Sequence, residues 1–211
     1  MSSIIFHTDE VQAFVATDTL ATSEGRPFMF TTKAFIVPHL QMIMCGTGVG
    51  GFLGRWFIKV NDGVVVRDVD HLDYHTPKSL AAFWGDYKKE VSLSDSITTT
   101  VYHFGFSAQD GLIHSYAYRS ANNFKSERLP YGIGVKPECQ VPNDYEFPAA
   151  IKQMMDEQRA IQASRPEHER IYIGGKIIIH HLTQMGFSVY TLDQFEDHDS
   201  DERAIYENFP A

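Results

Sequence analysis

A glycine-rich segment, GTGVGG at residues 46–51, is the first stretch of the chain whose residue types and spacing could do chemistry. Gly46, Gly48 and Gly51 match the G-x-G-x-x-G spacing that brings a backbone close to a dinucleotide phosphate. Asp68 stands about twenty residues further on, where such sites place a ribose-binding carboxylate. Taken alone, the segment predicts a phosphate cradle. The alternative is a loop whose main chain serves other chemistry.

The elements around this segment are mostly paired strands. Runs of β-branched and aromatic residues predict hairpins over residues 3–18, 98–120 and 176–192, and the last hairpin turns near Gly186. A further pair of strands is predicted over residues 33–45, with a break at Pro38. Helical spacing predicts helices over about 51–60, 149–163 and 77–91, the last beginning at Pro77. Residues 64–70 read as a brief strand or extended link, and the acidic residues 195–211 as a solvated tail.

This order of elements argues against a dinucleotide-binding fold. Such a fold needs parallel strands joined by helical crossovers, and only residues 40–70 could form one such unit. Dominant antiparallel hairpins predict instead an α+β fold of stacked antiparallel sheets with helices outside. We expect residues 1–211 to form a single domain.

The composition excludes several classes of partner. A net charge of -9 and a pI near 5.5 leave no basic stripe for phosphates, so we expect no nucleic acid and no anionic membrane surface as partners. No window reaches the ~20 apolar residues of a membrane span, and the N-terminus lacks the basic region of a signal peptide. The two cysteines, Cys45 and Cys139, fit a reducing compartment, so we expect a cytoplasmic protein.

The sequence predicts neither a metal nor a cofactor. His180 and His181 are neighbours on a predicted strand and must point to opposite faces, so they cannot easily bind one metal ion. Neither H-E-x-x-H nor a pair of C-x-x-C motifs occurs. Cys45 ends an apolar run and is expected to be a small core residue rather than a nucleophile.

Four marks at the start of the chain occur in a recognisable order. They are Ser2 directly after Met1, VATDTLAT at residues 15–22 with Asp18, Lys33, and CGTG at residues 45–48. Together they resemble the opening of proteasome β-type subunits, bacterial proteasome-like proteins among them, of the N-terminal-nucleophile (Ntn) hydrolase superfamily. The resemblance covers about the first 60 residues, and more loosely the central hairpin and residues 174–179. It implies a four-layer αββα sandwich and a homo-oligomer built as a ring or stacked rings.

The resemblance also implies a peptidase-like amide hydrolysis with Ser2 as nucleophile once Met1 is removed. The free α-amine of Ser2 titrates near pH ~8 and could take the proton of its own hydroxyl. Lys33 would keep that amine neutral by like-charge repulsion, and Asp18 would orient the lysine. A main-chain amide at Gly46 or Thr47 would face the oxyanion, which is the second interpretation of the glycine segment.

Two departures from the family pattern favour a different class of protein. The family generally starts with threonine, whereas Ser2 lacks the methyl group that fixes the rotamer. The D-x-x-S-G-G motif of many members corresponds here to RIYIGG at residues 170–175, without its polar side chains. The alternative is therefore a catalytically inactive ring subunit with a structural role. A dinucleotide-binding protein built on Gly46, Gly48 and Gly51 is a second and more distant alternative.

Overall fold

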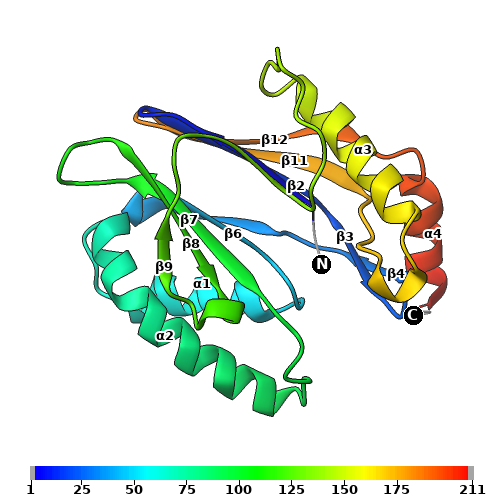
Figure 1. Cartoon of the computed structure of the whole chain (residues 1–211), viewed down its shortest axis with the longest axis horizontal. Helices are drawn as coiled ribbons and strands as arrows, with labels where there is room; N and C mark the ends of the chain where they lie inside the picture. Colours follow the sequence, from blue (N-terminus) through cyan, green and yellow to red (C-terminus); the bar gives the residue numbers. More distant parts are fainter. Residues whose placement is uncertain (1–2, 209–211) are drawn as a thin grey trace.

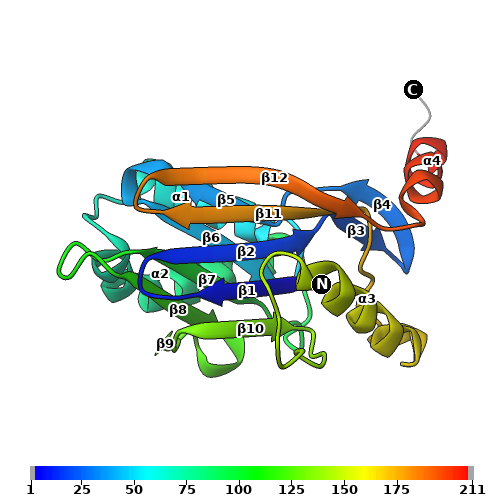
Figure 2. The same ribbon diagram turned by 90° about the horizontal axis from the view of Figure 1, so that it is seen from above.

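The computed structural model describes residues 3–208, which form two five-stranded antiparallel sheets, a two-stranded ribbon and four α-helices (Figure 1). The first sheet has the order β10-β1-β2-β11-β12 (Gly132–Lys136, Ile4–Thr8, Gln12–Asp18, Lys176–Thr183, Gly186–Gln194), which Figure 2 shows from above. The second has the order β5-β6-β7-β8-β9 (Ala34–Val37, Met42–Thr47, Thr100–Phe106, Ile113–Arg119, Ser126–Arg128). The ribbon consists of β3 and β4 (Leu20–Ser23, Arg26–Phe30).

The predicted mixed fold of antiparallel sheets and helices is confirmed. The three hairpins expected from the sequence are β1–β2, β7–β8 and β11–β12, and each pairs antiparallel. Side chains alternate between the two faces of a strand, so Ile4 and Val15 pack against residues of the second sheet such as Phe104. Their neighbours Ile5 and Ala16 pack in a separate cluster on the opposite face.

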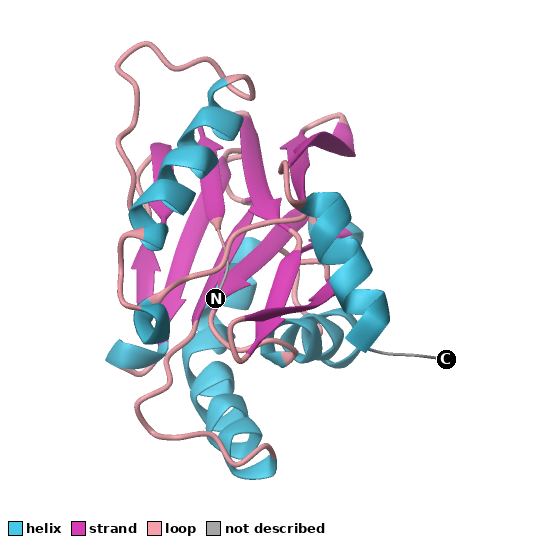
Figure 3. Ribbon diagram, turned by 90° about the vertical axis from the view of Figure 1, so that its right-hand side faces the viewer, coloured by secondary structure: helices cyan, strands magenta, loops and turns pink. Residues whose placement is uncertain are grey.

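Three of the four α-helices lie on the outer faces of the two five-stranded sheets (Figure 1), and Figure 3 shows the same arrangement from the side. Helices α1 (Phe52–Gly63) and α2 (Val69–Glu90) pack on the second sheet through a cluster that includes Phe52, Trp56 and Leu80. Helix α3 (Ala150–Ala163) packs on the first sheet through Ile151, Met154 and Met155. Among residues 3–208, no helix is long and apolar enough to cross a membrane.

The prediction that the second helix begins at Pro77 is wrong. Helix α2 begins at Val69 because Asp68 caps it, its side chain accepting a hydrogen bond from the main-chain N–H of His71 at 2.8 Å. Pro77 therefore lies inside the helix, and the extended link ends at residue 68. The second oxygen of Asp68 accepts from the N–H of Ala108, which joins the helix start to the turn between β7 and β8.

The C-terminal residues also differ from the expected tail. Helix α4 (His198–Asn208) forms there and packs near β4, with the buried His198 ring 4.8 Å from that of Phe30. The acidic residues of α4 are compatible with a helix because two of them, Asp199 and Asp201, lie in its first turn, where the helix dipole favours negative charge.

We expect Asp70 of α2 to make the fold sensitive to acid. Its carboxylate accepts hydrogen bonds from His114 Nδ1 and the Tyr116 hydroxyl of β8, both at 2.7 Å. Burial alone would raise the pKa of Asp70, but hydrogen bonds from Ser107, Tyr116 and His114 outweigh it and hold the pKa below 3.8. A carboxyl group whose pKa is lower in the folded than in the unfolded protein stabilises the fold at pH values above its ordinary pKa. This contribution to the free energy of unfolding is lost as the pH falls through the pKa of the folded protein.

Asp70→Asn should therefore lower the free energy of unfolding at neutral pH and reduce its decline in acid. Urea unfolding at pH ~7 and at pH ~3, on either side of the ordinary carboxyl pKa, measures both effects. Asp86→Asn, an exposed position on the same helix, is the control and should change neither. An acid dependence unchanged by Asp70→Asn would contradict the prediction.

Candidate active site

The pairing of β1 with β2 brings the start of the chain beside Asp18. Ile4 is opposite Thr17, so Ser3 comes opposite Asp18, and the main-chain N–H of Ser3 donates to Asp18 Oδ1 at 2.9 Å. Both residues are fully buried. Ser2, the expected nucleophile, lies outside the described residues.

Lys33 forms an ion pair with Asp18 that connects the two sheets. Asp18 ends β2 of the first sheet, whereas Lys33 directly precedes β5 of the second. Lys33 Nζ is 2.8 Å from Asp18 Oδ1 and 2.5 Å from the carbonyl oxygen of Leu20, and the lysine side chain is only 7% exposed. Asp18 Oδ2 also accepts from the N–H of Gly174 at 3.2 Å. The buried carboxylate thus has three donors and one compensating positive charge, the condition for keeping a charge inside a protein.

The pairing of β5 with β6 places Gly46 across from Lys33. Ala34 is opposite Cys45, and the pairing ends there, so the next residues of β6 border a pocket on this edge while their other edge pairs with β7. A methyl group on Gly46 would lie 2.7 Å from the carbonyl oxygen of Thr100, which explains why the position needs glycine. The carbonyl of Thr47, in turn, accepts from Thr99 Oγ1 at 2.8 Å.

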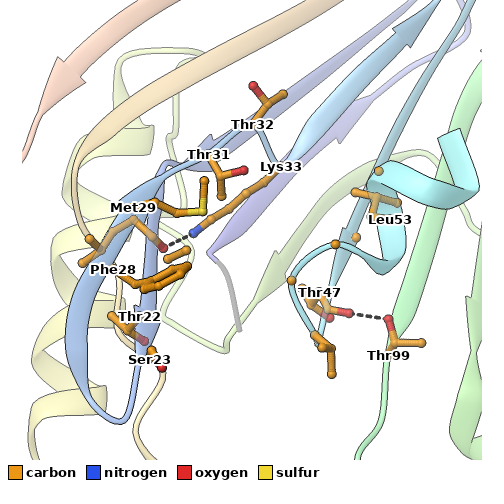
Figure 4. Close-up of a pocket in the computed structure, with 18 of the residues that line it drawn as sticks. Thr22, Ser23, Phe28, Met29, Thr31, Thr32, Lys33, Thr47, Leu53 and Thr99 are labelled. Atoms are coloured by element: carbon orange, nitrogen blue, oxygen red, sulfur yellow. Dashed lines mark hydrogen bonds between the residues drawn. The ribbon is translucent and has the colours of Figure 1, made fainter. Parts of the chain in front are cut away.

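A pocket of about 420 Å³ joins these residues. Figure 4 shows Lys33 pointing toward the β3–β4 side of the pocket, with Thr47 and Thr99 on the other side. Its lining includes Lys33, Gly46 and Thr47, together with apolar side chains from both sides: Leu20, Phe28, Met29, Phe35, Val49 and Leu53. The structure therefore brings Asp18, Lys33, Gly46 and Thr47 together at one end of the sheets.

The topology does not support the dinucleotide interpretation. The glycine segment does lead from β6 into α1, with Gly51 at the helix N-cap in the left-handed region (φ 86°). However, both neighbours of β6 run antiparallel to it, and every strand pair among residues 3–208 is antiparallel. The parallel crossover unit that such a site needs is therefore absent from this part of the chain, and Asp68 is used as a helix cap.

Two contacts at the site were not predicted from the sequence. The Ser3 hydroxyl donates to Gln158 Oε1 of α3 at 2.5 Å. Gly174 contributes through its main chain alone, since its N–H bonds to Asp18 and its carbonyl accepts from Thr19 and Leu20. The sequence did contain a signal for Gln158, because this residue lies at helical spacing from Ile151, Met154 and Met155 and so falls on the buried face of α3.

The other chemically capable residues lie elsewhere. His181 stacks on Phe14, whereas His180 is buried in the same strand, where loss of solvation lowers its pKa to about 4. Burial likewise raises the pKa of the Cys45 thiol, which disfavours the reactive thiolate. Within residues 3–208, no three His, Cys, Asp or Glu side chains are grouped so that they could hold a metal ion.

Comparison with known proteins supports the fold only. No protein-family model and no curated protein sequence matches the chain. Among solved structures, it is similar to Anbu (ancestral beta-subunit) from Yersinia bercovieri, with a TM-score of 0.61 at 10% sequence identity, over 98% of this chain and 92% of that one. The chain thus has a proteasome-like fold.

Proposed function

We propose that this chain is an Ntn hydrolase that cleaves amide bonds, peptide bonds included, with Ser2 as the nucleophile after Met1 has been removed. The observation that carries the proposal is the buried Lys33–Asp18 pair, bonded to the main chain of Ser3 and facing Gly46 across a pocket. The residue that directly follows Ser2 in the sequence is thus held at this pair by its main-chain N–H.

The reaction would proceed in two balanced steps. The Ser2 amine takes the hydroxyl proton while Ser2 Oγ attacks the substrate carbonyl, and a main-chain amide at Gly46 or Thr47 stabilises the oxyanion. The C–N bond then breaks, the leaving amine takes the proton, and an ester on Ser2 remains. Water, giving a proton to the Ser2 amine, attacks the carbonyl carbon of that ester. The ester C–O bond breaks, the acyl group leaves as a carboxylic acid, and the proton returns to Ser2 Oγ, which restores the free serine. Lys33 favours the neutral amine by charge repulsion, and Asp18 holds Lys33.

The wider resemblance completes the proposal. The αββα sandwich expected of such a hydrolase is part of this proposal, and the packing of helices on the outer faces of two facing sheets supports it. Assembly into a homo-oligomeric ring would then follow the family pattern, and the particle mass in light scattering tests it.

An inactive ring subunit is the second candidate, and one observation favours it. The segment at residues 170–175 approaches Asp18 through the main chain of Gly174 and offers no polar side chain of the D-x-x-S-G-G type. Such a subunit would retain the fold and the buried ion pair without needing a free N-terminal amine.

Intact mass and covalent labelling test the proposed activity. We expect the purified protein to lack Met1 and a β-lactone, which acylates N-terminal nucleophiles, to add one acyl group at Ser2. Ser2→Ala should abolish this acylation, whereas Ser188→Ala, at an exposed position of β12 outside the pocket lining, should not. Retention of Met1 with no acylation would support the structural subunit instead, and acylation that survives Ser2→Ala would reject Ser2 as the nucleophile.

A further inference from the structure

A chain of buried hydrogen bonds connects helix α3 to the candidate active site. Gln158 Oε1 accepts from the Ser3 hydroxyl, the Ser3 N–H donates to Asp18, and Asp18 pairs with Lys33. Gln158, Ser3 and Asp18 are each fully buried, and Lys33 nearly so. The outer helix is thereby bonded through the first sheet to a residue that lines the pocket.

Both ends of the Gln158 amide are occupied. Its Nε2 donates to the carbonyl oxygen of Pro137, directly after β10, while its Oε1 accepts from Ser3. This fixes the direction of the second bond, since the amide oxygen can only accept and the Ser3 hydroxyl must donate. The hydroxyl proton of Ser3 is therefore turned toward α3, and Ser3 is committed to a structural hydrogen bond.

We infer that Gln158 is a positioning residue for the N-terminal nucleophile. This inference rests on the proposed function. Ser3 is held by two bonds in different directions, its N–H to Asp18 of β2 and its hydroxyl to Gln158 of α3. Two such bonds fix both the location and the orientation of the residue that carries Ser2. Gln158 touches neither the pocket nor the reacting atoms, so it acts through Ser3.

The expected consequence is a change in rate without a change in reversible binding. Without the Gln158 bond, Ser3 keeps its contact with Asp18 but can rotate about it, and the attacking oxygen loses its alignment. Misplacement of a reacting group by about 1 Å can cost on the order of 100-fold in rate. The pocket walls that bind the reagent contain neither Ser3 nor Gln158, so reversible affinity should stay the same.

Helix α3 offers a matched control for this experiment. Gln162 lies one turn further along, is also buried (2% exposed), and also accepts a hydrogen bond, from the N–H of Ile171. Gln158→Met and Gln162→Met therefore make the same chemical change on the same helix face. Only the first removes a bond to Ser3.

We expect Gln158→Met and Ser3→Ala to slow β-lactone acylation by roughly 10- to 100-fold at saturating reagent, with unchanged reversible affinity. Because the two residues act as one unit, the double variant should be no slower than Gln158→Met alone. Gln162→Met should retain the acylation rate. Equal slowing by Gln158→Met and Gln162→Met, or no slowing by Gln158→Met, would overturn the inference.

A second measurement separates this inference from the proposed function. Amide hydrogen exchange of Ser3, followed by NMR, reports the bond to Asp18 whether or not the protein is an enzyme. Gln158→Met should speed this exchange by about tenfold or more, and Gln162→Met should not. If the wild-type protein is not acylated, the proposed function fails, but exchange still decides the role of Gln158: equal exchange rates in both variants would refute it.

Discussion

Replacing Lys33 by alanine is expected to abolish acylation of Ser2 and to destabilise the fold at the same time. The variant leaves the carboxylate of Asp18, which is fully buried, without a compensating charge. Breaking a buried ion pair in this way costs about 3–5 kcal/mol of unfolding free energy. Loss of the group that tunes the base should slow acylation by on the order of 10²- to 10⁴-fold. Urea unfolding and the rate of β-lactone labelling measure the two effects separately.

Lys152→Ala is the control for the loss of a lysine ion pair. Lys152 pairs with Asp156 one turn away on α3, but both side chains are partly exposed. Such pairs contribute no more than about 0.5 kcal/mol, and this one lies far from the pocket lining. If Lys33→Ala were as mild as Lys152→Ala, the buried pair would not have the role given to it. If Lys33→Ala strongly lowers the free energy of unfolding but the wild-type protein is never acylated, Lys33 would be part of a structural subunit.

Gly46→Ala is expected to have the second largest effect, because strand β6 has no space for a side chain at that position. The added methyl would lie 2.7 Å from the Thr100 carbonyl oxygen and 3.2 Å from Leu53, so β6, β7 or α1 must shift. Overpacking of this kind costs about 1–3 kcal/mol. A displaced oxyanion donor should slow acylation on the order of 100-fold.

Gly50→Ala, in the loop that follows β6 within the same glycine segment, provides the comparison. A methyl group there meets no atom within 4 Å, so its effect on stability should stay within about 0.5 kcal/mol. Acylation should also be close to that of the wild type. Equal slowing of acylation by both variants would mean that the whole glycine segment is sensitive to an added methyl group and that Gly46 has no special position at the site.

Much of the fold follows from local patterns in the sequence. The hairpins β1–β2, β7–β8 and β11–β12 and helix α3 were predicted because their apolar residues keep the period of a strand or of a helix over their whole length. Lys33, Asp18 and the glycine segment were selected because their order resembles the opening of proteasome β-type subunits, and the structure brings them together.

The errors arose where tertiary contacts override local signals. Pro77 suggested a helix start, but Asp68 caps α2 earlier and is itself held by Ala108, forty residues away along the chain. Helix α4 has an acidic sequence that reads as a tail, and its packing near β4 cannot be seen from composition. Gln158 reads as a polar residue of an amphipathic helix until its partner is known, and that partner is Ser3, at the other end of the sequence.

The candidate site combines residues from almost the whole length of the chain. Ser3 is separated from Gln158 by 155 positions and Asp18 from Gly174 by 156, and the Lys33–Asp18 pair requires both sheets to be in place. Contacts between such distant segments form late, because the loop between them must first be closed. During synthesis, the lysine, the aspartate and the glycine loop leave the ribosome long before Gly174 does. A nascent chain would therefore carry the residues of the candidate site without its geometry, and the proposed reactivity would require the completed fold.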